Sequence, residues 1–199
     1  TYPIGKNNDY RRVDLTIDQA GGAPSTTYTA EMINTSAVAL GHAVGTLDHV
    51  SAQRYHTITQ SPLNAVDVAR VQIFFQCTQK SDVVEILPDL QVAQWNGVGP
   101  PGTWVDRDGI ASGIDDPNCG GLSLYGDIIS AAFTTFTGNQ FSLASASGTN
   151  PLPVELLSFD AQQNGNAVDV AWTTASEFNS DYFVVQRSKN LQGFQNLAG

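Results

Sequence analysis

Hydrophobic and polar residues alternate at period two along most of the chain, which is the pattern of strands with one buried face. The alternation is clearest in three runs, at residues 13–17, 28–32 and 90–95. In the run 66–75, the apolar phase slips by one residue between Val68 and Val71, which predicts a β-bulge or a bend. The Gly- and Pro-rich run WNGVGPPGTW predicts a hairpin between strands at Trp95 and Trp104.

Long helices are not expected. The best helical candidate, residues 36–52, is interrupted by Gly41 and Gly45, so we expect at most one short turn there. Phe133 and the pair Phe141 and Leu143 predict two closing strands. Many short strands separated by turn residues predict an all-β fold, an antiparallel β-sandwich, over residues 1–147.

The composition changes at SASGTNPLPVE, which predicts a short Pro-containing linker over residues 148–153. Residues 154–199 then hold three strand-like segments, VELLSFDAQ, AVDVAW and DYFVVQRS, with a turn at QNGN between the first two. Three strands do not complete a sandwich, so we expect an incomplete fibronectin-III/Ig-like sandwich with an uncovered apolar face. The residues expected on this face are Val168, Val170, Trp172, Phe183 and Val185. A lost C-terminal half, the first domain or another molecule are the three candidates to cover it.

Composition narrows the function classes. Charged residues make up 14 % of the chain, against about 25 % in an average soluble domain, and the net charge is −10. Basic runs are absent, so we expect no nucleic-acid partner. No stretch approaches 18 apolar residues, so we expect no membrane span. The first residues lack the apolar region of a signal peptide, which suggests a processed or excised start, with cytoplasmic residence as the alternative.

The two cysteines, Cys77 and Cys119, are 42 positions apart and fit no zinc motif. Cys77 follows a core-like strand in phase with Ile73 and Phe75, whereas Cys119 lies in the loop-like run DDPNCGG. We predict a disulfide that ties this loop to the strand, with two free buried thiols as the alternative.

Catalytic patterns are missing from the sequence. It has neither a Gly-x-Ser-x-Gly elbow, nor an H-E-x-x-H pair, nor a phosphate-binding loop. His42, His49 and His56 are expected to be satisfied surface or loop residues. We therefore predict that the protein is not an enzyme and requires no cofactor.

The sequence offers two candidate ligand sites. Aspartates in VDRDGIASGIDDPN form a partial calcium-loop pattern at Asp106, Asp108, Asp115 and Asp116, although a turn held by Asx hydrogen bonds is the favoured interpretation. The aromatic residues Trp95, Trp104 and Tyr125 could stack on a glycan, although we expect at least one of the tryptophans in the core.

The segment from Pro151 to Phe194 resembles a segment near the C-terminus of many large secreted proteins of Bacteroidota. The matching elements are LPVEL-SF, W-T-ASE and DYF-V-RS, and runs such as YPIGKNNDYRRVDLTI resemble the β-sandwich module that commonly precedes them. The resemblance implies a fibronectin-III-like fold and export by the type IX secretion system to the cell surface or medium. It implies no catalytic residues.

Together these features predict a non-catalytic extracellular structural or adhesive module. We expect a stalk, fibre or filament subunit that assembles through exposed strands of its C-terminal segment, with itself or with neighbouring domains of the same surface protein. The alternative is a glycan- or calcium-binding accessory module of a larger secreted enzyme.

Overall fold

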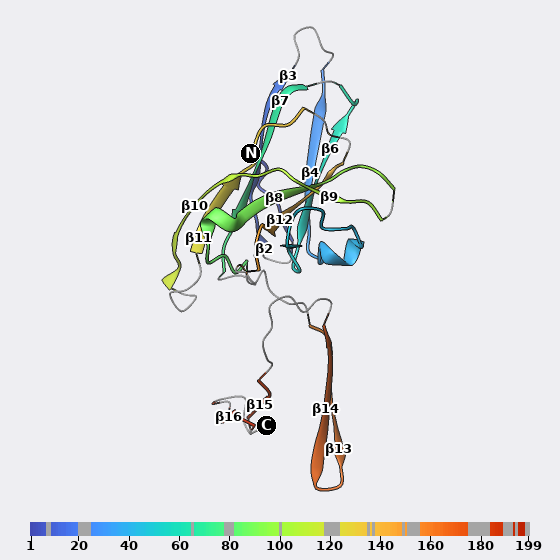
Figure 1. The fold of residues 1–199 in the computed structure, drawn as a ribbon, viewed down its shortest axis with the longest axis vertical. Helices are drawn as coiled ribbons and strands as arrows, with labels where there is room; N and C mark the ends of the chain where they lie inside the picture. The colour runs from blue at the N-terminus through green and yellow to red at the C-terminus, as the bar shows by residue number, and fades with distance from the viewer. Residues whose placement is uncertain are drawn as a thin grey trace.

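The protein is an all-β molecule made of two packed antiparallel sheets followed by a long and a short C-terminal hairpin, as the computed structural model shows (Figure 1). The predicted all-β sandwich class is thereby confirmed. The structure describes the chain except for residues 7–8, 20–24, 65, 78–81, 100, 118–123, 135, 137, 149, 151–155, 175–183, 189–192, 194 and 198–199.

The first sheet has the strand order β10-β11-β7-β3. Its strands are β3 (Val13–Gln19), β7 (Val66–Phe75), β10 (Ile110–Asp115) and β11 (Leu124–Ile129). The second sheet has the order β4-β6-β12-β8-β9, with β5 also paired to β12. Its strands are β4 (Thr27–Ile33), β5 (His49–Val50), β6 (Tyr55–Ser61), β8 (Leu90–Trp95), β9 (Trp104–Asp106) and β12 (Gln140–Ser145). A small ladder pairs β1 (Gly5–Lys6) with β2 (Asp9–Tyr10).

The main core fills the space between the two sheets. Alternate residues of β7 point into it, among them Val71 and Ile73, and they meet Val92 of β8 and Phe141 of β12. Rings of Phe133, Phe136 and Phe141 pack together at centroid distances of 5.2 to 6.3 Å. The period-two pattern of the sequence is therefore the direct cause of this core, because it places one apolar face on each sheet.

The second sheet is buried on its other face as well. Residues 34–48 fold over it and enclose a second, smaller core, which contains Ala37, Leu47, Val50, Ala93, Trp104 and Ala144. The covering segment contains a single 3-10 turn, η1 (Val38–Leu40), which ends at Gly41 with φ of 70°. This confirms that the segment holds no more than one helical turn. A second short 3-10 turn, η2 (Leu87–Asp89), precedes β8.

The expected strands at 13–17, 28–32 and 90–95 are confirmed as β3, β4 and β8, and Trp95 pairs with Trp104 across the predicted hairpin. The register of β7 shifts between Val66 and Val68, opposite Asp18 and Gln19, and not after Val68 as predicted. The prediction of a strand at Phe133 is wrong, because this residue makes only an isolated bridge to Ala69.

Beyond the sandwich, β13 (Leu156–Asn164) and β14 (Ala167–Thr174) form a long hairpin, with β15 (Gln186–Arg187) and β16 (Gln195–Asn196) as a second, short one (Figure 1). The β13–β14 hairpin corresponds to the first two strands expected in this segment. Of the third, residues 181–183 lie outside the described part of the chain. In the turn of the β13–β14 hairpin, Gly165 has a φ of 60°, as the first central position of a type II′ turn requires.

Candidate assembly surface

The β13–β14 hairpin has one apolar and one polar face. In its register Phe159 lies opposite Trp172 and Ala161 lies opposite Val170, so these four side chains share one face with Val168. The other face carries polar cross-strand pairs such as Ser158 with Thr173 and Gln162 with Asp169. The amphipathic character therefore follows from the alternation along both strands, although the polar residue Gln163 lies on the apolar face opposite Val168.

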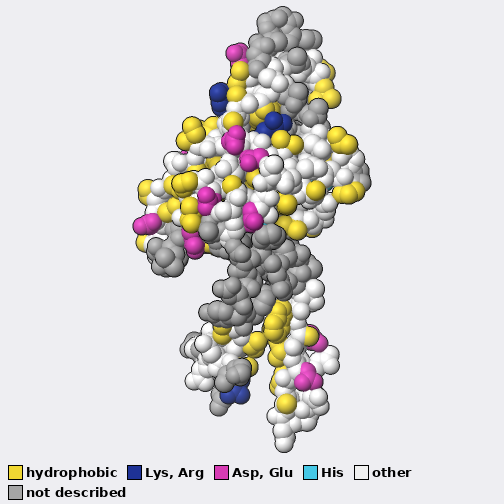
Figure 2. Space-filling model, viewed as in Figure 1, with side chains coloured by type: hydrophobic (Ala, Val, Ile, Leu, Met, Phe, Trp, Pro, Cys, Tyr) yellow, Lys and Arg dark blue, Asp and Glu magenta, His cyan; other side chains and the backbone are white. Residues whose placement is uncertain are grey.

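Two side chains of this apolar face, Phe159 and Val168, are open to solvent, whereas Trp172 is 36 % exposed and Val170 is half-buried. Phe159 is 58 % exposed and Val168 is 60 % exposed, whereas large apolar residues in the sandwich core are almost fully buried. Figure 2 shows the hydrophobic side chains as a column along one side of the hairpin. A contiguous exposed apolar face of this kind is typical of an interaction surface.

Sequence reasoning found three members of this face, Val168, Val170 and Trp172, and the structure places all three on one side of β14. It missed Phe159, which the hairpin register would have revealed once the turn at Gly165 was fixed. Phe183 lies outside the described residues. Val185 is half-buried and immediately precedes β15.

A second exposed apolar surface lies on the outer face of the first sheet. Its members are Ile110 and Ile114 on the edge strand β10, and Tyr125 and Ile129 on β11. The register pairs Ile110 with Ile129 and Ile114 with Tyr125, so the four side chains form two adjacent rows. Figure 2 shows hydrophobic side chains gathered over the region of β10 and β11. We call this surface the outer face.

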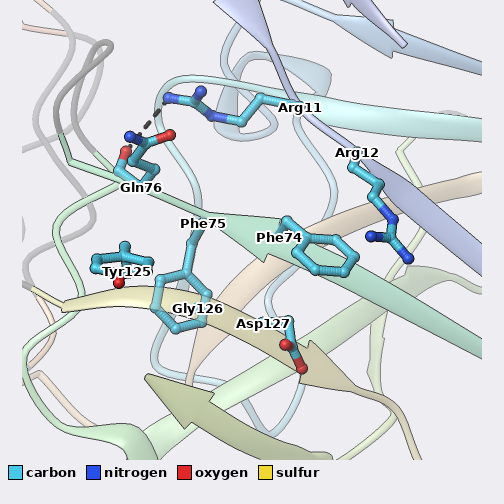
Figure 3. Close-up of a pocket in the computed structure, with 8 residues that line it drawn as sticks. All are labelled: Arg11, Arg12, Phe74, Phe75, Gln76, Tyr125, Gly126 and Asp127. Atoms are coloured by element: carbon cyan, nitrogen blue, oxygen red, sulfur yellow. Dashed lines mark hydrogen bonds between the residues drawn. The ribbon is translucent and has the colours of Figure 1, made fainter. Parts of the chain in front are cut away.

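Two hollows indent this side of the first sheet. The first has a volume of about 520 Å³ and lies between Tyr125 and Asp127 of β11 and Phe74 of β7, with Arg12 at its rim (Figure 3). The second has a volume of about 410 Å³ and lies near the far end of β11, against Ile110, Ile129 and Arg70. Both volumes fall within the range of about 300–1,000 Å³ that is usual for binding pockets.

The rim of the first hollow is held in place by charge. The guanidinium of Arg12 lies 4.5 Å from the centre of the Phe74 ring, and its Nε donates to Oδ1 of Asp14 at 3.0 Å. The hydrogen bonds from Arg12 lower the pKa of the Asp14 carboxyl, which therefore stays ionised. The wall of the hollow next to Phe74 is thus preorganised.

Charged groups behind this hollow are buried in the fold. Asp82 pairs with Arg11 (Nε to Oδ2, 3.1 Å) and with Arg54 (Nε to Oδ1, 3.6 Å), and all three side chains are at most 3 % exposed. His56 is buried in the same region; burial, with Arg54 and Arg11 as further causes, lowers the pKa of its imidazole to about 3. Because these side chains are almost completely shielded from solvent, we assign them a role in stabilising the fold and not in an open binding site.

The three residues predicted as a glycan platform do not come together. Trp104 is 1 % exposed and packs in the second core, so it cannot present its face to a sugar; at least one tryptophan was expected there. Trp95 is half-buried and stacks on His42 at 5.3 Å between ring centres. Tyr125 is exposed, but it lies on the opposite sheet. Of the three, Tyr125 lines the first hollow.

The four aspartates predicted as a calcium site are also separated. Asp106 accepts the backbone N–H of Asp108 at 2.8 Å, which is the Asx turn favoured from the sequence. Asp115 and Asp116 lie at the other end of β10, whose six residues span about 17 Å. No cluster of three or more His, Cys, Asp or Glu side chains arises among the residues described.

The histidines have structural contacts. The N–H of Gly102 donates to Nδ1 of His42 at 3.0 Å, so the proton of this ring is on Nε2, which donates to Gln140 Oε1 at 2.9 Å. His49 contacts Asp48 at 2.8 Å and, like His56, is buried, not at the surface as expected.

The disulfide between Cys77 and Cys119 stays a prediction, because Cys119 lies outside the described residues. Cys77 Sγ lies 3.8 Å from Oδ2 of Asp116, three positions before Cys119 in the chain. The cysteine after β7 thus lies beside the start of the loop to which we expect it to be bonded.

No protein-family model, curated protein or solved structure matches this chain. Among the described residues, no helix has the length and apolar character needed to cross a membrane.

Proposed function

We propose that the protein is a non-catalytic, extracellular structural or adhesive module whose copies assemble through the β13–β14 hairpin into a stalk, fibre or filament. The observation that supports this most directly is the two-faced hairpin, in which Phe159 and Val168 expose more than half of their surface to solvent. Burying such a side chain stabilises a contact by about 1.5–3 kcal/mol, which favours association over an isolated hairpin.

Extracellular location rests on the resemblance of residues 151–194 to the C-terminal segments of secreted Bacteroidota proteins, and on the low charged fraction of 14 %. Non-catalytic status is supported by the roles of the histidines. Both ring nitrogens of His42 are hydrogen-bonded, to Gly102 and to Gln140 of β12, and His56 is buried, so neither is placed to exchange protons with a substrate.

Sedimentation velocity over a range of protein concentrations tests this function. We expect concentration-dependent association of the wild-type chain, and at least tenfold weaker association of Val168→Asp, which places a charge on the apolar face. Thr173→Asp is the matched control, since it adds the same charge to the same strand on the polar face. A wild-type chain that stays monomeric throughout would contradict the proposal, as would equal effects of the two variants.

A glycan-binding accessory module is the second candidate, and the first hollow supports it. The hollow combines an exposed Tyr125 with the carboxylate of Asp127, which is the pairing of aromatic face and hydrogen-bond acceptor that carbohydrate binding uses. A glycan array probed with the wild type and with Tyr125→Ala separates the candidates. Binding that is lost in the variant would favour this function, and an array without signal would remove it.

A further inference from the structure

We propose that Asn164, at the tip of the β13–β14 hairpin, is a site of spontaneous deamidation, and that its conversion to aspartate or isoaspartate weakens assembly. Asn164 is followed by Gly165, and the sequence contains one other Asn-Gly pair, Asn96–Gly97. The modification itself is independent of the proposed function, whereas its effect on assembly rests on that function.

The reaction needs only water. The backbone nitrogen of Gly165 attacks Cγ of Asn164 and closes a cyclic succinimide. The bond from Cγ to Nδ2 breaks, and ammonia leaves with the proton that the attacking nitrogen has lost. Water then opens the ring at Cγ, which gives aspartate, or at the backbone carbonyl, which gives isoaspartate with the main chain running through the side chain. Glycine favours the attack because it has no Cβ beside the nitrogen.

The turn leaves the attacking nitrogen accessible. The last residue pair of the hairpin ladder is Asn164 with Ala167, so the N–H of Gly165 lies in the two-residue turn, outside the ladder. Both Asn164 and Gly165 are exposed to solvent. No atom of a residue beyond its chain neighbours lies within 4 Å of the place that a Cβ of Gly165 would occupy. Water and hydroxide therefore reach both reacting groups.

The hairpin also permits the backbone movement that ring closure requires. β13 and β14 form a sheet of two strands, and a two-stranded hairpin without further packing is marginally stable in water. The side-chain amide of Asn164 is held by an exposed hydrogen bond from Nδ2 to Oδ2 of Asp169, at 2.9 Å. A hydrogen bond of this kind contributes little net stability, so the amide is released whenever the tip of the hairpin opens.

The second Asn-Gly pair is held far more firmly. Oδ1 of Asn96 accepts the backbone N–H groups of Val98 at 3.1 Å and Thr103 at 3.3 Å, and the N–H of Asn96 donates to the carbonyl of Thr103 at 3.0 Å. Asn96 directly follows β8, which pairs with β9 in the second sheet of the sandwich. Ring closure at Asn96 therefore requires part of the sandwich to open.

Conversion of Asn164 changes the hairpin in two ways. An N–H donor is replaced by a carboxylate, which repels the carboxylate of Asp169 to which the amide was bonded. Isoaspartate also lengthens the backbone by one carbon at the ladder pair with Ala167, next to the turn that sets the register. Both changes lower the fraction of chains with a formed hairpin, and the apparent affinity of assembly falls with that fraction.

Peptide mapping by mass spectrometry of the full chain, incubated at mildly alkaline pH, tests the modification. We expect Asn164 to lose its amide at least about tenfold faster than Asn96, because the isolated hairpin opens more often than the sandwich. Asn166, in the same turn but followed by Ala167, is the second internal control and should stay unchanged. Enzymatic methylation of isoaspartate should label the hairpin peptide, and Asn164→Gln should abolish the label.

Sedimentation velocity of fresh and aged samples tests the effect on assembly. Aged wild type and fresh Asn164→Asp should associate about fivefold more weakly than fresh wild type, since each lacks the hydrogen bond to Asp169. Aged Asn164→Gln is the matched control, because it passes through the same incubation without converting at this position, and it should associate as strongly as before ageing.

Each failure has a separate meaning. Equal rates at Asn164 and Asn96, or at Asn164 and Asn166, would overturn the modification site. If Asn164 converts but aged wild type and Asn164→Asp associate like the fresh protein, the effect on assembly is overturned, and assembly through the hairpin stands. A fresh wild-type chain that does not associate would overturn the proposed function and the effect on assembly together, and the peptide map would still decide whether Asn164 is modified.

Discussion

Two hairpins of the molecule each carry a cross-strand aromatic pair, but the pairs differ in how far they are buried. In the sandwich, Trp95 lies opposite Trp104, and residues 34–48 cover the pair, so that Trp104 is only 1 % exposed. In the C-terminal hairpin, Phe159 lies opposite Trp172, and Phe159 remains 58 % exposed. The alternation along the strands is the same in both. A covering segment, and not the strand pattern, therefore decides whether such a face becomes a core or an interaction surface.

Truncating the aromatic residues of the two pairs should have very different consequences for folding. We expect Trp104→Ala to lower the free energy of unfolding by about 4 kcal/mol, because a large buried side chain is lost and a cavity remains. Phe159→Ala should change it by less than about 0.5 kcal/mol. Urea unfolding of the sandwich, at a concentration where the chain is monomeric, measures the change in the free energy of unfolding for both variants. Equal losses would show that the hairpin face is covered in the monomer.

Removing a buried charge should also separate the two regions. Asp82→Asn leaves Arg11 and Arg54 without their shared carboxylate in the interior, so we expect a loss of about 3 kcal/mol. Asp169→Asn, on the polar face of the hairpin, is the comparison, and it should change the free energy of unfolding by less than about 0.5 kcal/mol. An Asp82→Asn variant with the same free energy of unfolding as the wild type would mean that the ion pairs contribute nothing to the stability of the sandwich.

Periodicity predicted much of this fold because most strands are half-buried. Val13, Leu15 and Ile17 alternate with polar residues, and the strand they indicate is present as β3. The pattern failed at Phe133, because a single buried aromatic residue fits a packed loop as well as a strand. The pattern also predicted the bulge of β7 too far along the strand. Ala69 is fully buried and belongs to the same inward-facing series as Val71, but its small side chain was not recognised as part of the hydrophobic pattern.

The candidate surfaces were predictable only in part. Val168, Val170 and Trp172 could be assigned to one face from local alternation alone. The hollows could not, because Phe74, Tyr125 and Arg12 come from three separate segments that only the sheet order brings together. Trp104 was misjudged as a possible platform residue for a related reason: the segment that covers it lies about sixty positions earlier in the chain.

Buried His56 should make the sandwich, and not the hairpin, sensitive to acid. His56 has a folded pKa of about 3, well below its usual value of 6.5. Between about pH 6.5 and pH 3, His56 is therefore protonated in the unfolded chain but neutral in the folded chain. The free energy of unfolding consequently falls as the pH falls through this range, by up to about 1.4 kcal/mol per pH unit. His56→Leu should flatten this dependence in urea titrations between pH 6.5 and 4. An unchanged slope would assign acid sensitivity to other groups.

The smallest expected effect concerns the hairpin turn, and it bears directly on the comparison between the two hairpins. Gly165 adopts φ of 60° with open space where a Cβ would be, so Gly165→Ala meets no steric clash and suffers only the backbone penalty of about 1 kcal/mol. Because the turn lies in the hairpin and outside the sandwich core, this penalty should weaken association about fivefold and leave sandwich unfolding unchanged. Sedimentation and urea unfolding of the same sample measure the two quantities. A variant that unfolds earlier but associates normally would reverse the assignment, because it would show that the turn supports the sandwich and not the assembly surface.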